Sequence, residues 1–454
     1  MTALKQYIDL YTEHRAAIEA HAPAALNALR PAALKALDGA RLPRKGEEDY
    51  EGTDLEQAFA PDYGVNVNRT PFTADPGQAF SCDVPNMSTC LYFFYNDIFS
   101  PSRTARQLPG GVVVESLAQA QHNHPEILTK YLGSLADLSK PEVALNTLLA
   151  QDGMLVYIPD GVTAEKPIQL VNIYNAAAPV MAVRRLLVVV GENAHAKMLV
   201  CDHTQNTGVD YLGSQVVEIV ALKDATFDYY DLEETNASTH RVSSVFVDQR
   251  EGSNVLVDGM TLLNGFTRND YYVNVDGEHC QTQLLGMTIA SGTQHVDNHS
   301  LLCHNKPNCH SNEMFKYVLN DEAVGAFAGK ILVKPGCPKT DAYQGNRNIV
   351  AAPTAKMYSK PQLEIYTDDV QCSHGTAIGQ LDEEALFYMR TRGIPLDQAR
   401  MLLMQAFVDD VIDGVRLDAL KDRLRHLVEK RFQGKMAMCQ ACAGNGCNSK
   451  IETY

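Results

Sequence analysis

The amino-acid sequence predicts a mainly β protein, a β-helix with helical regions at both ends. From about Val112 to Tyr366 it consists of short segments rich in β-branched and aromatic residues, separated by polar turns. Within this stretch a similar turn recurs at Gly191, Leu222, Arg250 and Asp276. The turns are separated by about 25–30 residues, a spacing typical of repeat architectures.

The repeat favours stacked units over a single folded sheet. Each unit has two or three strands around one polar turn and no crossover helix, and the segment NDEAVGA at Asn320 resembles the other turns. One unit cannot bury its own apolar face, whereas stacked units share a continuous core. A β-sandwich is the second interpretation, and it would need Asn-Gly or Asp-Gly hairpin turns at regular spacing. In this stretch only Asp276-Gly277 has convincing strands on both sides.

The N-terminal residues predict helices followed by a connector. Residues 2–37 are rich in Ala and Leu, and Pro23 and Pro31 predict two or three short helices in place of one long helix. The polar, charged stretch from Gly39 to Gly64 predicts a surface loop or a mobile connector.

The C-terminal residues predict three further helices. Apolar residues return at helical spacing after Leu381, after Pro395 and after Leu417. We therefore expect residues 1–110 to form an N-terminal helical region with a connector, and residues 111–370 to form the β-helix core. Residues 371–454 then form a C-terminal helical region with a cysteine-containing tail.

Composition excludes several functions. A net charge of −16 argues against a nucleic-acid-binding surface, which needs clustered Lys and Arg. The most apolar stretch, Leu186 to Val190, is far too short to span a bilayer, and the N-terminal residues do not resemble a signal peptide. Eleven cysteines spread along the chain do not form a dense disulfide framework. We expect a cytoplasmic protein with reduced thiols.

The segment QCSHG contains the first candidate site. We expect the last strand at Gln362–Tyr366, followed by a polar loop that contains Cys372 and His374. In an extended chain residues two apart project from the same face. A thiolate beside an imidazole suits iron or zinc. The Cys-x-His spacing is not specific, and a turn with an ordinary cysteine and a surface histidine is the alternative.

Two other groups of potential metal ligands occur. Residues 295–310 contain His295, His299, Cys303, His304, Cys309 and His310. These residues predict either a metal site on the solenoid wall or ordinary polar strand residues, and the lack of a zinc-like spacing favours the second interpretation. Near the C-terminus, Cys439 and Cys442 are followed by Cys447. Three thiolates could hold zinc or a cluster with a fourth ligand, and a functionally silent or oxidisable tail is equally compatible with the spacing.

The segment GAFAGKI, residues 325–331, is the nearest match to a phosphate-binding loop. It is one residue too short and has Ile331 where a magnesium-binding Ser or Thr belongs. We interpret it as a β-rung with small residues that allow close stacking, and we expect no intrinsic nucleotide site.

Residues 290–410 closely resemble the SufD-type proteins of the SUF iron–sulfur cluster assembly machinery. The matching phrases are KPQLEIY, DDV, CSHG, GQLDEEALFY and RGI, together with GKILVKPGCPKTDAYQGNRNIV and TQHVDNHSLLCHNKPNCHSNEMFK. In the N-terminal half the likeness is limited to architecture and phrases such as RLPRKGEEDYEGTDL. The resemblance implies a right-handed parallel β-helix flanked by N- and C-terminal helical regions.

The resemblance also implies a function in metal homeostasis. The chain would be a non-catalytic subunit that pairs with a SufB-type scaffold and a SufC-type ABC ATPase to build and deliver clusters, with a role in iron acquisition. Iron or an iron–sulfur cluster would be shared transiently with the partner. His374 matches a family histidine at the scaffold interface, near the cluster-building cysteine of the scaffold, and Cys372 matches a neighbouring family cysteine. The expected ATPase-docking residues are Leu381, Leu386, Phe387, Met389, Arg390 and Phe407.

Three further interpretations remain open from the sequence. The isolated chain could form a homodimer through its last solenoid strands. The chain could be the SufB-like paralogue, a scaffold that itself carries the nascent cluster, although QCSHG and GQLDEEALFY favour the D-type subunit. A β-helix enzyme acting on polysaccharide would need convergent carboxylates and exposed aromatic residues, whereas this chain has no Trp and its acidic residues are scattered.

Overall fold

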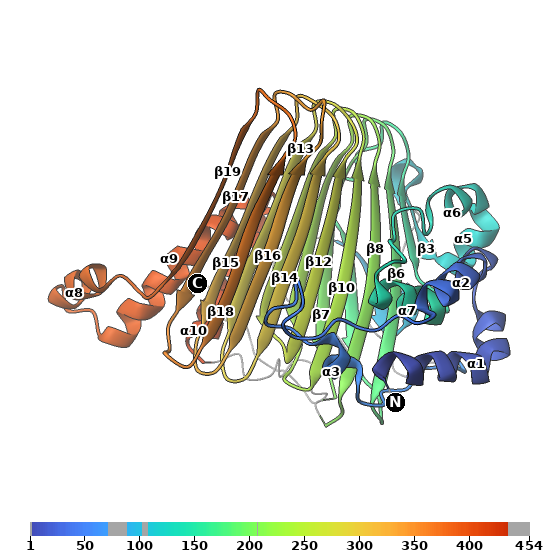
Figure 1. Cartoon of the computed structure of the whole chain (residues 1–454), viewed down its shortest axis with the longest axis horizontal. Helices are drawn as coiled ribbons and strands as arrows, with labels where there is room; N and C mark the ends of the chain where they lie inside the picture. The colour runs from blue at the N-terminus through green and yellow to red at the C-terminus, as the bar shows by residue number, and fades with distance from the viewer. Residues whose placement is uncertain (1, 71–88, 102–107, 207, 435–454) are drawn as a thin grey trace.

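The centre of the molecule is a parallel β-solenoid with helices at both ends (Figure 1). The computed structural model describes residues 2–70, 89–101, 108–206 and 208–434. Two sheets face each other across the solenoid lumen, one of ten strands and one of nine. The mainly β fold predicted from the sequence is confirmed.

The chain alternates between the two sheets, so that each turn of the solenoid adds one strand to each sheet. Pairing is parallel along both sheets, except for the antiparallel pairs β1–β2 and β3–β4 at the N-terminal end. The β-sandwich interpretation is therefore wrong, because the parallel neighbours that make up most of both sheets are joined through the opposite sheet and not by hairpins. The ten-stranded sheet contains β1 (Cys90–Tyr95), β2 (Ile98–Pro101), β5 (Ile168–Tyr174), β7 (His195–Thr204), β9 (Thr226–Glu234), β11 (Asn254–Leu263), β13 (Gln281–Ala290), β15 (His310–Leu319), β17 (Asp341–Val350) and β19 (Gln371–Gly379). The nine-stranded sheet contains β3 (Val113–Ser116), β4 (Met154–Ile158), β6 (Val180–Val190), β8 (Tyr211–Ala221), β10 (Thr239–Gln249), β12 (Phe266–Val275), β14 (His295–His304), β16 (Val324–Val333) and β18 (Lys356–Ile365).

The recurring turns lie along one edge of the solenoid. At this edge the chain passes from the nine-stranded to the ten-stranded sheet, and one residue in each turn has a positive φ: Asn193, Asp224, Gly252 and His279. Asn, Asp and Gly tolerate this left-handed conformation best, which explains the polar turn sequences. The fifth predicted turn differs, because Asp321 lies between β15 and β16 at the opposite edge.

The N-terminal helices pack near the first turns of the solenoid, against outward-facing residues of the nine-stranded sheet such as Leu187 and Leu212. They are α1 (Ala3–His21), α2 (Ala24–Leu37), α3 (Leu55–Phe59), the 3₁₀ helix η1 (Pro109–Gly111), α5 (Leu117–Asn123), α6 (Pro125–Tyr131) and α7 (Pro141–Leu149). Pro23 is the N-cap of α2 and separates it from α1, as predicted. Pro31 does not start another helix but lies inside α2.

The connector before α3 is not a mobile loop but a segment bound to the nine-stranded sheet (blue, crossing the strands in Figure 1). The Arg268 guanidinium lies 4.2 Å from the ring centroid of Tyr50 and donates a 2.9 Å hydrogen bond to the backbone oxygen of Asp49. Thr53 is buried and its Oγ1 lies 2.9 Å from Nε2 of His295. The sequence predicts a surface loop or a mobile connector here, and in the structure Asp49, Tyr50 and Thr53 of this segment contact the outer face of the sheet.

The C-terminal helices cover the outer face of the ten-stranded sheet. They are α8 (Glu383–Thr391), α9 (Leu396–Gly414) and α10 (Asp418–Phe432), so the three predicted helices are confirmed. Val408 and Val411 of α9 and Leu424 of α10 pack with Leu285 and Met287 of β13 in one apolar cluster. In Figure 1, α8 lies beyond the last strands of the solenoid.

Candidate functional site

The last turn of the solenoid is an open end. β18 and β19 are the terminal strands of the two sheets, and in the described part of the chain each pairs along one side only, with β16 and β17. An open strand edge presents unpaired backbone groups and is a common site of association with another protein.

His374 and Cys372 lie on β19 and not in the loop that we predicted. They are two residues apart and share the face that points to the lumen. Cys372 is partly buried against the solenoid core, and this burial raises the pKa of its thiol, whereas His374 is exposed. The strand escaped prediction because an open end buries little of either face, so its sequence lacks apolar alternation.

Exposed large apolar side chains occur on the last strands of the solenoid. Tyr343 lies on β17, Ile365 and Tyr366 lie at the end of β18, and Ile378 lies on β19, with Tyr366 60% and Ile378 53% exposed. A concentration of exposed large apolar residues at one place indicates an interaction surface. No sequence pattern singles out these residues, because their exposure depends on their position in the last turn.

The residues predicted to bind an ATPase partner fall into two groups. Leu386 is buried, and Leu381 and Phe407 pack partly against the apolar cluster under α9 and α10. Met389 is half-buried. Phe387 and Arg390 are exposed, and Phe387 is 70% exposed to solvent.

Tyr388 on α8 and Leu402 on α9 are also exposed, so with Phe387 these two helices carry a second set of exposed large apolar side chains. The helical pattern of the sequence placed Leu386 and Phe387 side by side without indicating which of them faces the protein. The tail cysteines Cys439, Cys442 and Cys447 lie outside the described residues.

The histidine and cysteine residues of segment 295–310 do not converge. His295 and His299 share the outer face of β14 and lie under the connector, where Asp270 Oδ1 is 3.1 Å from His299 Nδ1. His304 points into the lumen, where its Nε2 lies 2.9 Å from Ser311 Oγ.

Burial lowers the pKa of both His295 and His304 to about 4, so both rings are neutral near neutral pH. Among the residues that the structure describes, there is no group of three His, Cys, Asp or Glu side chains that could hold a metal ion. The structure therefore supports the polar-strand interpretation of this segment.

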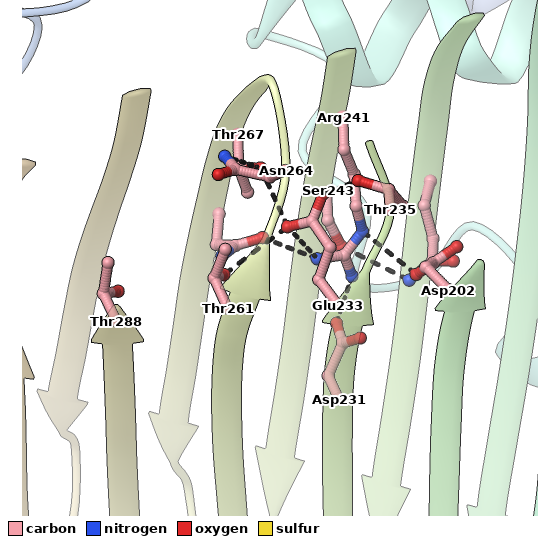
Figure 2. A network of polar contacts seen from close by, with 12 residues as sticks. Asp202, Asp231, Glu233, Thr235, Arg241, Ser243, Thr261, Asn264, Thr267 and Thr288 are labelled. Carbon is pink, nitrogen blue, oxygen red and sulfur yellow. Dashed lines mark hydrogen bonds and ion pairs between the residues drawn. The ribbon is translucent and has the colours of Figure 1, made fainter. Parts of the chain in front are cut away.

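A buried network of charges lies in the middle of the lumen (Figure 2). Arg241 on β10 forms ion pairs with Asp231 and Glu233 of β9 and with Asp202 of β7, the last at 3.2 Å. Arg184 forms a second ion pair with Asp202, at 2.7 Å. Burial raises the pKa of Glu233 to about 7 in spite of the nearby guanidinium. The network joins the two sheets across the lumen and lies several turns away from His374.

The segment GAFAGKI lies within strand β16 and not in a loop before a helix. An added Cβ at Gly325 would lie 2.8 Å from both the Leu319 and the Met357 side chains. Small residues thus allow close packing of the lumen here, as predicted from the sequence.

Fold and site together define a β-solenoid protein whose last turn and C-terminal helices present apolar surface and an exposed histidine. Residues 172–407 match the SUF system FeS cluster assembly SufBD core domain, and residues 1–170 match the SufBD protein N-terminal region. The chain therefore belongs to the SufBD family of iron–sulfur cluster assembly proteins.

Curated relatives agree with this assignment. The chain is 29% identical over 400 residues to the iron–sulfur cluster assembly SufBD family protein slr0076 of Synechocystis sp., covering 86% of this chain and 88% of that protein. It is 27% identical over 305 residues to the iron–sulfur cluster assembly protein SufD of Escherichia coli, covering 66% and 72%. It is 26% identical over 333 residues to the chloroplastic protein ABCI7 of Arabidopsis thaliana, covering 71% and 69%. The described helices include none that is long and apolar enough to cross a membrane.

Proposed function

We propose that this chain is a SufD-type subunit that pairs with a SufB-type scaffold and a SufC-type ATPase to build iron–sulfur clusters. The observation that supports it best is the exposed His374 on the last turn of the solenoid, a turn that also carries the exposed apolar residues Ile365 and Ile378. A scaffold subunit of the same fold would cover this apolar surface. Iron or the nascent cluster is then the shared cargo, and His374 ligates iron or orients a ligand of the partner.

A second surface, on α8 and α9, is proposed to bind the ATPase. Phe387, Tyr388 and Leu402 are exposed there, and Arg390 adds a positive charge at the end of α8. This chain would contribute no nucleotide site, so ATP energy would come from the partner.

We place the complex in the cytoplasm, with a role in iron acquisition. We also propose that the isolated chain forms a homodimer through the last turn of its solenoid, the surface that would otherwise bind the scaffold.

Co-expression tests the scaffold contact. Tagged wild-type chain should co-purify with SufB- and SufC-type partners, and His374→Ala should lower the iron and sulfide content of the anaerobically purified complex. His122→Ala is the matched control, because His122 is an exposed histidine on α5 in the N-terminal region, away from the last turn. Unchanged iron and sulfide in the His374 variant would refute the proposed role. A stable cluster on the isolated chain would instead indicate that the chain is itself the scaffold.

Substitution at Phe387 tests the ATPase contact separately. Phe387→Ala should weaken ATPase binding about tenfold or more, the usual effect of truncating a central aromatic contact. Leu34→Ala is the matched control, since Leu34 is an exposed apolar residue of α2 in the N-terminal region. Equal ATPase binding by the Phe387 variant and wild type would place the contact elsewhere.

A further inference from the structure

His374 is the last member of a column of side chains that face the lumen. The register of the ten-stranded sheet aligns one residue from each strand between β7 and β19, with neighbours about 4.8 Å apart along the solenoid. The first four members are apolar or aromatic and belong to the core, and the last three are polar. In order they are Met198, Tyr229, Val257, Leu284, Glu313, Gln344 and His374.

The two polar residues behind His374 are buried and joined by hydrogen bonds. Glu313 is 1% exposed and Gln344 is 3% exposed. Ser300, on β14 of the facing sheet, donates to Oε1 of Glu313, and Gln344 Nε2 donates to Oε2 of Glu313 at 3.0 Å. Both carboxylate oxygens of Glu313 therefore have a donor.

The carbonyl oxygen at the other end of the Gln344 amide lacks a hydrogen-bond donor. Its Oε1 is buried and accepts no hydrogen bond from any described residue. The register places Glu313 on one side of Gln344 and His374 on the other. Because an ionised carboxylate only accepts hydrogen bonds, it holds the NH₂ group of Gln344, which leaves the carbonyl oxygen for a donor elsewhere. A buried acceptor without a donor is costly, and an imidazole N–H is a suitable donor.

We propose that Ser300, Glu313 and Gln344 form a positioning relay for His374, in which Gln344 Oε1 accepts the N–H of one ring nitrogen. The other ring nitrogen is then unprotonated and faces outward, where it can bind iron or accept a hydrogen bond from a partner. The relay itself concerns the isolated chain, and its use by a scaffold rests on the proposed function. Ser300, Glu313 and Gln344 are positioning residues, because they act through His374.

Two further observations agree with a relay. An added Cβ at Gly329 would lie 2.6 Å from Gln344 Nε2 and 2.9 Å from Ser300 Oγ. A glycine at this position therefore leaves space for the Gln344 and Ser300 side chains. Burial also raises the pKa of Glu313 to about 7 although both of its hydrogen bonds favour the charged form. A buried carboxyl group with a raised pKa, two positions behind an exposed histidine in the column, is typical of functional sites.

The ring proton of His374 can be located directly in the full-length chain. Histidines labelled with ¹⁵N in the ring are observed by NMR at about pH 8.5, where imidazole is neutral, and the His374 signals are assigned with His374→Gln. We expect one tautomer to dominate in wild type. In Gln344→Met the ratio of the tautomers should change about fivefold, the ratio that one ordinary hydrogen bond supplies.

Thr376→Val is the matched control. Thr376 lies on the same strand, and its hydroxyl is 2.7 Å from Ser359 Oγ, so this variant removes a polar atom without touching Gln344. Its tautomer ratio should equal that of wild type. Glu313→Gln provides a second test should Gln344→Met fail to fold, because an amide at position 313 no longer fixes the orientation of Gln344 and the tautomer preference should fall.

The outcomes separate the relay from the proposed function. A tautomer ratio that is unchanged in Gln344→Met or in Glu313→Gln, or that changes equally in Thr376→Val, overturns the relay. A relay that passes this test, together with unchanged cluster yield in His374→Ala, would overturn the proposed role of His374 in cluster assembly and leave the relay intact.

Discussion

Asp258 provides a quantitative test of the packing between the solenoid and its C-terminal helices. It lies on β11 between Tyr230 and Leu285 of the neighbouring strands. The side chain is fully buried, and neither carboxylate oxygen has a hydrogen-bond partner among the described residues. Burial alone raises the pKa of this carboxyl from 3.8 to about 8. At neutral pH it is therefore protonated in the folded protein and ionised in the unfolded chain.

The direction of the pH dependence follows from this difference. Between pH values of about 4 and 8 the folded state binds one proton more than the unfolded state, so the free energy of unfolding falls as pH rises. Each pH unit corresponds to about 1.4 kcal/mol for one group. From about pH 5 to about pH 8 the loss is up to about 4 kcal/mol, and structural relaxation will reduce it to about 2–4 kcal/mol.

The variant Asp258→Asn removes the titration and keeps the side-chain volume. Urea unfolding followed by circular dichroism, at about pH 5 and about pH 8.5, should show that the stability of the variant relative to wild type rises by about 2–4 kcal/mol at the higher pH. Glu278→Gln, at an exposed turn, should show little pH-dependent difference. The same difference between Asp258→Asn and wild type at both pH values would refute the reasoning.

Three other substitutions test the packing of the solenoid and its helices. Arg241→Leu should lower the free energy of unfolding by about 3–5 kcal/mol, because it leaves buried carboxylates without their partner, and urea unfolding measures this. Gly329→Ala should cost about 1–3 kcal/mol by forcing Gln344 and Ser300 apart, whereas Gly375→Ala, where an added Cβ meets nothing within 4 Å, should be close to neutral in the same assay. Leu386→Ala should lower the stability of the C-terminal helices by about 2–3 kcal/mol, whereas Phe387→Ala should leave it unchanged, because Leu386 is buried and Phe387 is exposed; hydrogen exchange of α8 and α9 distinguishes the two.

Much of the architecture follows from local sequence signals. The polar turns recur because each solenoid turn needs a residue such as Asn193 or Asp224 in the left-handed conformation. The C-terminal helices have their own start and stop residues, with Asp382 capping α8 and Pro395 preceding α9. The His374 and Cys372 pair was also visible in the sequence, because residues two apart share a face in any extended strand. Signals of this kind act over a few residues, so they can be interpreted without knowing what packs against them.

The tertiary structure decided which of these residues are exposed, buried or adjacent. Only the pairing of β19 with β17 makes residues 371–379 a strand, and only the register between turns places Gln344 and Glu313 behind His374. The connector binds to the sheet because Arg268 and His295, more than 200 residues away in the sequence, provide partners for it. In a solenoid, residues about 30 positions apart become neighbours through backbone pairing between successive turns. The polar column and the open end arise from this stacking, which no short stretch of sequence encodes.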